Sequence, residues 1–531
     1  MPRIERPLGR LAFGAAVTLC LVAGVGLVLA GNGPAGAAGL APVYVTSTGD
    51  GPAGICGSPG HPDCTLRDAI ETVALRRADR RILARYCEPG DPGPYCLNRN
   101  DPNFDAVAGV WRIVLSEPYG LDITGTNVTI DFSDGVPDWA GAPDNVVEID
   151  TGGGDGLDWA FGIDGAGHEL RGFNVRGTVK TAAIVVYNGA KDVTIDSLAL
   201  AAITGDAIRI RDEQTQRTRV ISTQCGWFGA LGDGGGALLP TPVTGTCVQI
   251  SRGAHDNWIV SEDADGQVVP PNTFANAAVG VDVTGKGTRA NRVEGNRMDS
   301  DGVGVRITGG ALETVVRANT IVGGGGNGIE IQGDSWKSVL EENRIGVESD
   351  DVPAERTNGN GGWAIDIAAP AKDTQASGNR IQGNAVGGIH IAGRTAELIR
   401  LTQNRITGNE GPAVAVEGGA NHGILPPELH LSGERVIGRS CPLCVVEVFS
   451  DPADEAASYE GSTTADNGGN VVFTPTGPFK HRFITALATD PDGNSSAIAA
   501  AVDTVPQPTP TPTATPGGGR VYLPIAYRHD S

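Results

Sequence analysis

A short apolar–polar–apolar phrase recurs along the middle of the chain, with a glycine beside most copies. The copies begin at Val281, Val305, Ile329, Ile365, Ile389 and Val414. Successive copies start 24, 24, 36, 24 and 25 residues apart. This alternation predicts short strands that bury one face. A fixed period of this size predicts that the strands stack as successive coils of a β-solenoid.

Asparagines follow the same period. Asn319, Asn343 and Asn379 each lie 14 residues after the start of their phrase, whereas Asn296 and Asn404 lie 15 residues after theirs. An asparagine at the same turn of successive coils can bond the backbone of the next coil and tolerates left-handed conformations. We therefore predict a stacked asparagine ladder, with Asn296 and Asn404 out of line.

The strand pattern also extends towards the N-terminus, where phrases start at Phe161, Ile184, Ile208 and Val248 and a first strand starts at Trp111. Residues 111–425 are thus predicted to form an all-β parallel solenoid. Three coils are longer than the others, and their extra residues are 226–246, 262–278 and 348–362. The extra residues fall at a similar phase of the coil, which predicts three loops on one side of the solenoid.

Composition agrees with a fold built from many tight turns. The 531 residues include 78 glycines and only 5% aromatic residues, and glycine enters left-handed turns without a steric penalty. The formal net charge is −22. Such a surface repels nucleic acid and anionic lipid, so neither is expected as a partner.

The N-terminus has the pattern of an export signal. Arg3, Arg6 and Arg10 precede an apolar run over residues 11–30, and small residues follow at 35–37. We predict a signal peptide over residues 1–37 and a secreted or cell-surface protein with no membrane span after cleavage. An uncleaved anchor is the alternative, because the run is long enough to cross a bilayer.

The remaining eight cysteines form four close pairs. An even number, close spacing and an export signal together predict disulfides in an oxidising compartment. Metal binding is the weaker alternative, since no cysteine pair has a suitably spaced second pair beside it. The predicted disulfides are Cys56–Cys64, Cys87–Cys96, Cys225–Cys247 and Cys441–Cys444.

The most distinctive motif lies between residues 43 and 73. The strings Val45-Thr46-Ser47 and Cys64-Thr65-Leu66-Arg67-Asp68-Ala69-Ile70 resemble the CSLREA domain of secreted bacterial β-helix proteins, with Thr65 in place of serine and Asp68 in place of glutamate. Thr65 and Asp68 also form a capping-box pattern, after which Leu66, Ile70 and Val73 share one helical face. Residues 43–110 are therefore predicted to be an N-terminal cap followed by a stapled loop.

The repeat region resembles right-handed parallel β-helix proteins related to pectate lyases. This resemblance implies a right-handed coil and a substrate laid across an outward strand face. The catalytic motifs of two relatives are missing. The strings nearest to the Gly-His-Gly of polygalacturonases are Gly167-His168-Glu169 and Asn421-His422-Gly423, and no Asp-Pro-His-Glu of the epimerase type occurs.

The C-terminal part changes character. Residues 426–504 alternate strand patterns with turns and resemble bacterial Ig-like β-sandwich modules. A Pro/Thr linker is predicted at residues 505–519 and a short tail at 520–531. The run from Asp490 to Asn494 could bind calcium, but a hairpin turn is the favoured interpretation.

The middle residues of the phrases should point outward and align on stacked strands. They are Gln249, Asp282, Arg306, Glu330, Asp366 and His390. Glu330 and Asp366 would then be adjacent carboxylates, as in a sugar-cleaving acid/base pair. Arg306 and His390 would flank them in catalysis, and Gln249 and Asp282 would bind ligand. Surface charges that pair for solubility are the structural alternative.

Two function classes follow from this site. The leading hypothesis is adhesion or glycan binding without catalysis, by a monomer whose partner is a polysaccharide or cell-surface glycan. The alternative is a polysaccharide lyase or glycoside hydrolase acting along the outward face. No cofactor is expected except calcium, for which acidic loops at 262–265 and 348–351 and a single nonapeptide-like string at 153–160 are candidates.

Overall fold

The computed structural model describes residues 41–504 apart from 52–53, 57–62, 77–79, 88–95, 98, 107–108, 134–144, 153–155, 229–238 and 350–357. The predictions on the signal peptide (1–37), the linker (505–519) and the tail (520–531) concern residues outside the described ones. The same holds for the first three residues of the nonapeptide-like string and for the tips of two of the three predicted loops.

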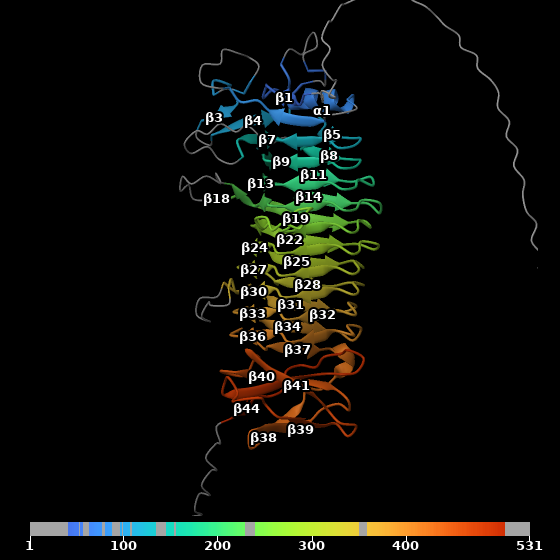
Figure 1. The fold of residues 1–531 in the computed structure, drawn as a ribbon, viewed down its shortest axis with the longest axis vertical. Coiled ribbons are helices and arrows are strands. Elements are labelled where there is room, and N and C mark those ends of the chain that lie inside the picture. Colours follow the sequence, from blue (N-terminus) through green and yellow to red (C-terminus); the bar gives the residue numbers. More distant parts are fainter. Residues whose placement is uncertain are drawn as a thin grey trace, which may run out of the picture. The chain divides into compact units, whose positions relative to one another are not determined.

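The chain winds through three long sheets, here called A, B and C, and each coil visits them in that order (Figure 1). Neighbouring strands within a sheet are parallel, except for the antiparallel pair β3 and β4. Sheet A contains β1 (Val43–Val45), β2 (Arg81–Ala84), β6 (Thr129–Asp131), β9 (Glu169–Arg171), β12 (Thr194–Asp196), β15 (Arg219–Ile221), β20 (Trp258–Val260), β23 (Arg292–Glu294), β26 (Val315–Arg317), β29 (Val339–Glu341), β32 (Gln375–Ser377) and β35 (Arg400–Thr402).

Sheet B contains β3 (Phe104–Asp105), β4 (Val110–Val114), β7 (Val147–Asp150), β10 (Asn174–Gly177), β13 (Ala199–Ile203), β16 (Gln224–Cys225), β21 (Thr273–Ala275), β24 (Arg297–Asp299), β27 (Thr320–Val322), β30 (Arg344–Ile345), β33 (Arg380–Gln382) and β36 (Arg405–Thr407). Sheet C contains β5 (Leu121–Ile123), β8 (Phe161–Ile163), β11 (Ala182–Val186), β14 (Asp206–Arg211), β19 (Val243–Ser251), β22 (Ala277–Thr284), β25 (Val303–Thr308), β28 (Ile329–Ile331), β31 (Trp363–Ala368), β34 (Gly387–Ala392) and β37 (Val414–Glu417).

The recurring phrases are the strands of sheet C, in the register that their spacing predicts. Val305 pairs with Ile329, and Ile329 pairs with Ile365, although 36 residues separate the last two. The outer residues of these phrases are buried in one continuous core, except for Val416 in the last coil, which is partly buried against it. The predicted parallel β-helix is therefore confirmed.

Helix α1 (Leu66–Ala74) covers the N-terminal end of the solenoid. Thr65 and Asp68 form the predicted capping box, and Leu66, Ile70 and Val73 are buried. The preceding and following segments are more than a cap, because β1 and β2 pair in parallel and extend sheet A up to β6. Parallel pairing thus begins at Val43, well before Trp111.

Residues after η2 (Ala420–Gly423) form two antiparallel sheets. One contains β38 (Glu428–Ser432), β39 (Arg435–Arg439) and β42 (Asn470–Phe473). The other contains β40 (Val445–Asp451), β41 (Ser458–Thr464), β43 (Phe483–Thr489) and β44 (Val502–Asp503). Two packed antiparallel sheets are what a sandwich requires, and the resemblance to Ig-like modules stays a prediction.

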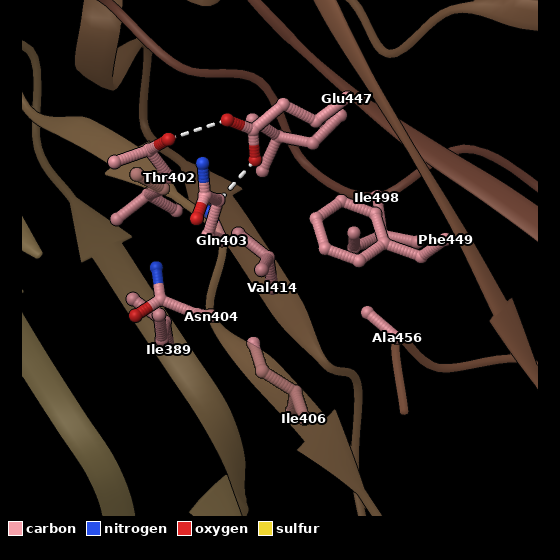
Figure 2. Close-up of a pocket in the computed structure, with 12 residues that line it drawn as sticks. Ile389, Thr402, Gln403, Asn404, Ile406, Val414, Glu447, Phe449, Ala456 and Ile498 are labelled. Atoms are coloured by element: carbon pink, nitrogen blue, oxygen red, sulfur yellow. Dashed lines mark hydrogen bonds between the residues drawn. The ribbon is translucent and has the colours of Figure 1, made fainter. Parts of the chain in front are cut away.

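The C-terminal module closes the open end of the solenoid. The amides of Leu398 and Leu401 donate to Asn494 Oδ1 (2.7 Å) and Ser495 Oγ (2.9 Å). Figure 2 shows Glu447 reaching from the module to Thr402 and to the amide of Gln403, the latter at 2.8 Å. These bonds occupy backbone groups that a further coil would otherwise use, which protects the edge of sheet A.

The asparagine ladder is longer than expected and corrects one prediction. From the second member on, each Oδ1 accepts the backbone amide, the side-chain amide or both of the preceding ladder residue, at 2.8 to 3.1 Å. The members are Asn272, Asn296, Asn319, Asn343, Asn379 and Asn404. The expectation that Asn296 and Asn404 sit out of line was wrong. Every member directly precedes a strand of sheet B, and the extra residue falls earlier, between sheets C and A.

The long loops correct a second prediction, because only two of them leave the same corner. The first follows β16 and contains the hairpin of β17 (Trp227–Phe228) and β18 (Leu239–Pro240); the third follows β30. Both lie between sheets B and C. The second loop spans residues 261–272, between sheets A and B, since β21 resumes the coil at Thr273. All four predicted disulfides are present.

Candidate functional site

The six predicted site residues lie on consecutive strands of sheet C, and we call them the charged column. Backbone register pairs each member with the next. The loop over residues 348–362 does not spread the coils, since Glu330 pairs directly with Asp366. In chain order the column is Gln249, Asp282, Arg306, Glu330, Asp366 and His390.

The side chains in the first half of the column form hydrogen bonds with one another. Asp282 is only 2% exposed. Its carboxylate accepts Arg306 Nε at 3.0 Å and Gln249 Nε2 at 3.3 Å. The bond to Asp282 raises the pKa of Arg306. These three residues therefore form a satisfied cluster, with Asp282 holding the arginine against the sheet.

In the second half of the column, Glu330 lies beside the hydrogen-bonded pair of Asp366 and His390. Asp366 Oδ1 lies 2.8 Å from His390 Nδ1, and Asp366 Oδ2 accepts Asn327 Nδ2 at 3.3 Å. Glu330 accepts a hydrogen bond from the side chain of Gln332. Partial burial, followed by the nearby charge of Asp366, raises the pKa of Glu330. Glu330 therefore lies beside a carboxyl group that is already hydrogen-bonded to His390 and Asn327.

An aromatic residue that the spacing of the phrases does not predict completes this half of the column. The indole of Trp363 stacks on the imidazole of His390, with ring centroids 4.8 Å apart and planes 13° from parallel. Its backbone amide donates to Asn327 Oδ1 at 2.8 Å. Gly387 makes room for the ring, because a Cβ there would lie 2.2 Å from Trp363 Cζ3. A tryptophan three residues before Asp366 and a glycine three before His390 were the available signal.

A second outward row runs beside the column, two residues further along each strand. Its members pair in register and are Arg211, Ser251, Thr284 and Thr308. The hydroxyls of Thr284 and Thr308 are 2.9 Å apart. The outer face of sheet C thus presents hydroxyl groups beside charged groups, both of which hydrogen-bond sugar hydroxyls.

The acidic loops are organised by their own backbone. Asp263 Oδ1 accepts the amides of Asp265 and Gln267, both at 2.9 Å. Asp490 Oδ1 accepts those of Gly493 and Asn494, both at 2.8 Å, as the predicted turn requires. Within the described part of the chain, no three metal-ligating side chains converge. Calcium binding stays a prediction.

Two hollows lie away from the charged column. One, between the last coil and the C-terminal module, has a volume of about 10 Å³ (Figure 2), which is room for about one water molecule. The other, of about 280 Å³, lies at the corner between sheets A and B and contains Arg317 paired with Glu342 at 3.3 Å. Neither α1 nor η2, the helices of the described residues, has the length and apolar character to cross a bilayer.

Comparison with known proteins identifies the solenoid but no specific relative. The family model described as a right-handed beta helix region matches residues 252–425. Among curated proteins no sequence matches this chain.

Several solved structures are similar at low identity. The A-module of mannuronan C-5 epimerase AlgE6 from Azotobacter vinelandii has 12% identity and a TM-score of 0.35, over 59% of this chain and 91% of that chain. The surface adhesin PfbA of Streptococcus pneumoniae has 12% identity and a TM-score of 0.37, over 75% and 98%. The Dettilon tailspike protein has 13% identity and a TM-score of 0.34, over 84% and 80%. Similarities of this strength carry no conclusion about activity or ligand. The family match and the three parallel sheets show that this chain folds as a right-handed parallel β-helix.

Proposed function

We propose that the outer face of sheet C binds a glycan at Trp363 and the neighbouring half of the charged column, without cleaving it. The observation that carries this proposal is the Trp363 ring held flat against His390, beside Asn327 and Asp366. The C–H face of a sugar packs on an aromatic ring, while its hydroxyls need donors and acceptors in fixed positions. This surface offers both.

Pairing within the column supports binding over catalysis. Asp282 is neutralised by Arg306, and Asp366 is hydrogen-bonded to both His390 and Asn327. A glycosidase needs one carboxyl as acid and a second free to act as base or nucleophile. Glu330 has no such free partner in this arrangement.

Polysaccharide cleavage is the second candidate, and one observation favours it. The pKa of Glu330 is raised, through burial and then through Asp366 one coil away. Two neighbouring carboxyl groups, one of them with a raised pKa, are the pairing that acid-catalysed glycoside cleavage uses.

The four disulfides indicate an oxidising compartment. We propose that the protein acts outside the cytoplasm or at the cell surface, on a polysaccharide or cell-surface glycan. The net charge of −22 disfavours a polyanionic glycan unless divalent cations intervene.

A panel of immobilised glycans tests the proposal with two variants. Trp363→Ala should lower binding by about two- to tenfold, the usual contribution of an aromatic contact. Trp258→Ala is the matched control, because Trp258 lies on sheet A against Arg219. Equal binding by Trp363→Ala and wild type would overturn the proposal.

Chain cleavage is measured on the same glycans by the release of reducing or unsaturated ends. Cleavage by the wild-type protein that is lost in Glu330→Gln would replace the binding proposal with the enzymatic one. Binding that survives in Glu330→Gln, with no cleavage by either protein, would exclude the enzymatic candidate on those glycans.

A further inference from the structure

A second aromatic pair lies on the outer face of sheet C, towards its N-terminal end. Trp159 stands two residues before β8, and Tyr187 directly follows β11 on the next coil. Their ring centroids are 5.5 Å apart and their planes differ by 41°. Both side chains are partly exposed.

Two glycines, Gly120 and Gly162, leave the space in which the indole of Trp159 lies flat on the sheet. A Cβ on Gly162 would be 2.5 Å from Trp159 Nε1, and one on Gly120 would be 2.7 Å from Cδ1. The indole N–H donates to Asp122 Oδ1 at 3.0 Å. Asp122 and Gly162 pair in register, in line with the column positions further along sheet C. Trp159 is therefore held by one hydrogen bond over two glycines, with its other face outward.

Polar groups around the pair have unused hydrogen-bonding capacity. No described residue forms a hydrogen bond with the Tyr187 hydroxyl. The guanidinium of Arg211 lies 5.5 Å from the centre of the Tyr187 ring. Its buried Nε has no hydrogen-bond partner among the described residues, and Asp212 is at the limit of an ion pair, at 4.0 Å. The Arg211 side chain as a whole is 19% exposed, so a ligand would have to reach the guanidinium at atoms other than the buried Nε.

We propose that Trp159 and Tyr187 form a second sugar-binding site, separate from the one at Trp363. The C–H face of one pyranose ring stacks on the aromatic pair. Tyr187 Oη and the guanidinium of Arg211 then bond its hydroxyls. Asp164, which already accepts Asn188 Nδ2 at 2.7 Å, has a second oxygen for the same purpose.

Charge selects the class of sugar at this site. Asp122 and Asp164 both raise the pKa of Tyr187, after burial, and Arg211 opposes them. Asp212 adds a third carboxylate beside Arg211. With three carboxylates against one guanidinium, the site favours uncharged hexoses and N-acetylated or amino sugars, and disfavours uronates.

The strand order suggests that one glycan can reach both sites. Six strand steps of sheet C separate β11 from β31, or roughly 30 Å at one strand spacing each. A chain running parallel to the coil axis would cover this distance. This shared-chain arrangement rests on the proposed function, whereas the site at Trp159 stands without it.

The experiment uses the full-length protein and a series of neutral and N-acetylated oligosaccharides of increasing length, with oligogalacturonate as the acidic counter-probe. Trp159→Ala should weaken binding of the neutral series by about two- to tenfold. Tyr187→Phe keeps the ring and removes only the hydroxyl, so it tests the site without threatening the fold. It should weaken binding by about two- to tenfold.

The outcomes separate the two sites. Loss of binding in Trp159→Ala and Tyr187→Phe with none in Trp363→Ala supports this inference and overturns the proposed function. Loss of binding only in Trp363→Ala supports the proposed function and overturns this inference. The inference is also overturned if the wild-type protein binds none of the neutral series, or if oligogalacturonate binds most tightly and Tyr187→Phe leaves that binding unchanged.

Discussion

A buried aspartate in the corner between sheets B and C gives the sharpest test of the packing argument. Asp301 lies two residues after β24 and is 2% exposed. Its Oδ1 accepts the amide of Ala277 at 3.0 Å, whereas Oδ2 has no partner among the described residues. Asp301→Asn should therefore stabilise the protein.

Later coils show what an amide does at this position. Asn360 and Asn384 follow the equivalent strands, and each Oδ1 accepts a backbone amide of the preceding coil, at 3.0 and 3.2 Å. Their Nδ2 atoms donate to the carbonyls of Ile321 and Ile345, at 3.2 and 3.3 Å. Asparagine at 301 would keep the existing acceptor and supply the missing donor.

The magnitude follows from proton linkage. Burial raises the pKa of Asp301 from 3.8 to about 8. The folded protein therefore holds a proton that the unfolded chain releases between these two values. Stability from this group is fully present below about pH 4 and falls by about 1.4 kcal/mol per pH unit up to about pH 8. At pH 7 the accumulated cost is about 4 kcal/mol, which Asp301→Asn removes.

Guanidinium chloride unfolding of wild type and Asp301→Asn at pH 5, 7 and 9 measures this cost. The variant should be more stable by about 2 kcal/mol at pH 5 and about 4 kcal/mol at pH 7, with the difference level above pH 8. Amide exchange at Ala277 should slow in the variant. Asp334→Asn is the matched control on an exposed carboxyl. A difference that is independent of pH, or a less stable variant, would refute the reasoning.

Three further predictions concern the ladder, the C-terminal module and one glycine. Asn343→Ala leaves the backbone and side-chain amides of Asn319 without their acceptor and should cost about 3 kcal/mol in chemical unfolding; a loss below about 1 kcal/mol would contradict this. Burial raises the pKa of Glu447, so its contribution to docking is complete at acidic pH and declines as pH rises through the raised value. Glu447→Gln should remove this dependence from amide exchange at Gln403, unlike Glu428→Gln on the surface; an unchanged profile would argue against it. Gly226→Ala places a Cβ 1.6 Å from the carbonyl of Ala275 at a φ of +80° and should lower stability by at least about 2 kcal/mol. Gly266→Ala, with a φ of +75° and open space around it, should cost only about 1 kcal/mol, and equal losses would count against the steric account.

The sequence alone determined the solenoid and the charged column, because both depend only on period. Side chains two residues apart on a strand share a face, and strands one period apart stack. Counting from Val305 to Ile329 to Ile365 is therefore enough to align Arg306, Glu330 and Asp366. The capping box of Thr65 was equally local, since its partner lies within one helical turn.

Only the tertiary structure decided what depends on more than one sheet. Counting from sheet C misplaced Asn296 and Asn404, because the extra residue falls in the turn between sheets C and A, whereas the ladder keeps step with sheet B. The side of the solenoid from which each loop leaves could not be predicted for the same reason. The spacing of strands in one sheet gives the length of each coil, but it does not show at which corner of the coil the extra residues are inserted.

The two aromatic pairs are formed by side-chain contacts between neighbouring coils, which the spacing of the repeats does not predict. Trp363 meets His390, and Trp159 meets Tyr187, across neighbouring coils, and each indole lies in space that a glycine leaves free. Trp159 and Trp363 both lie two residues before the start of their phrase, but the period does not report which side chain of the next coil each indole contacts. The sequence thus determined which residues line up along the outer face of sheet C, and the tertiary structure decided which side chains meet there.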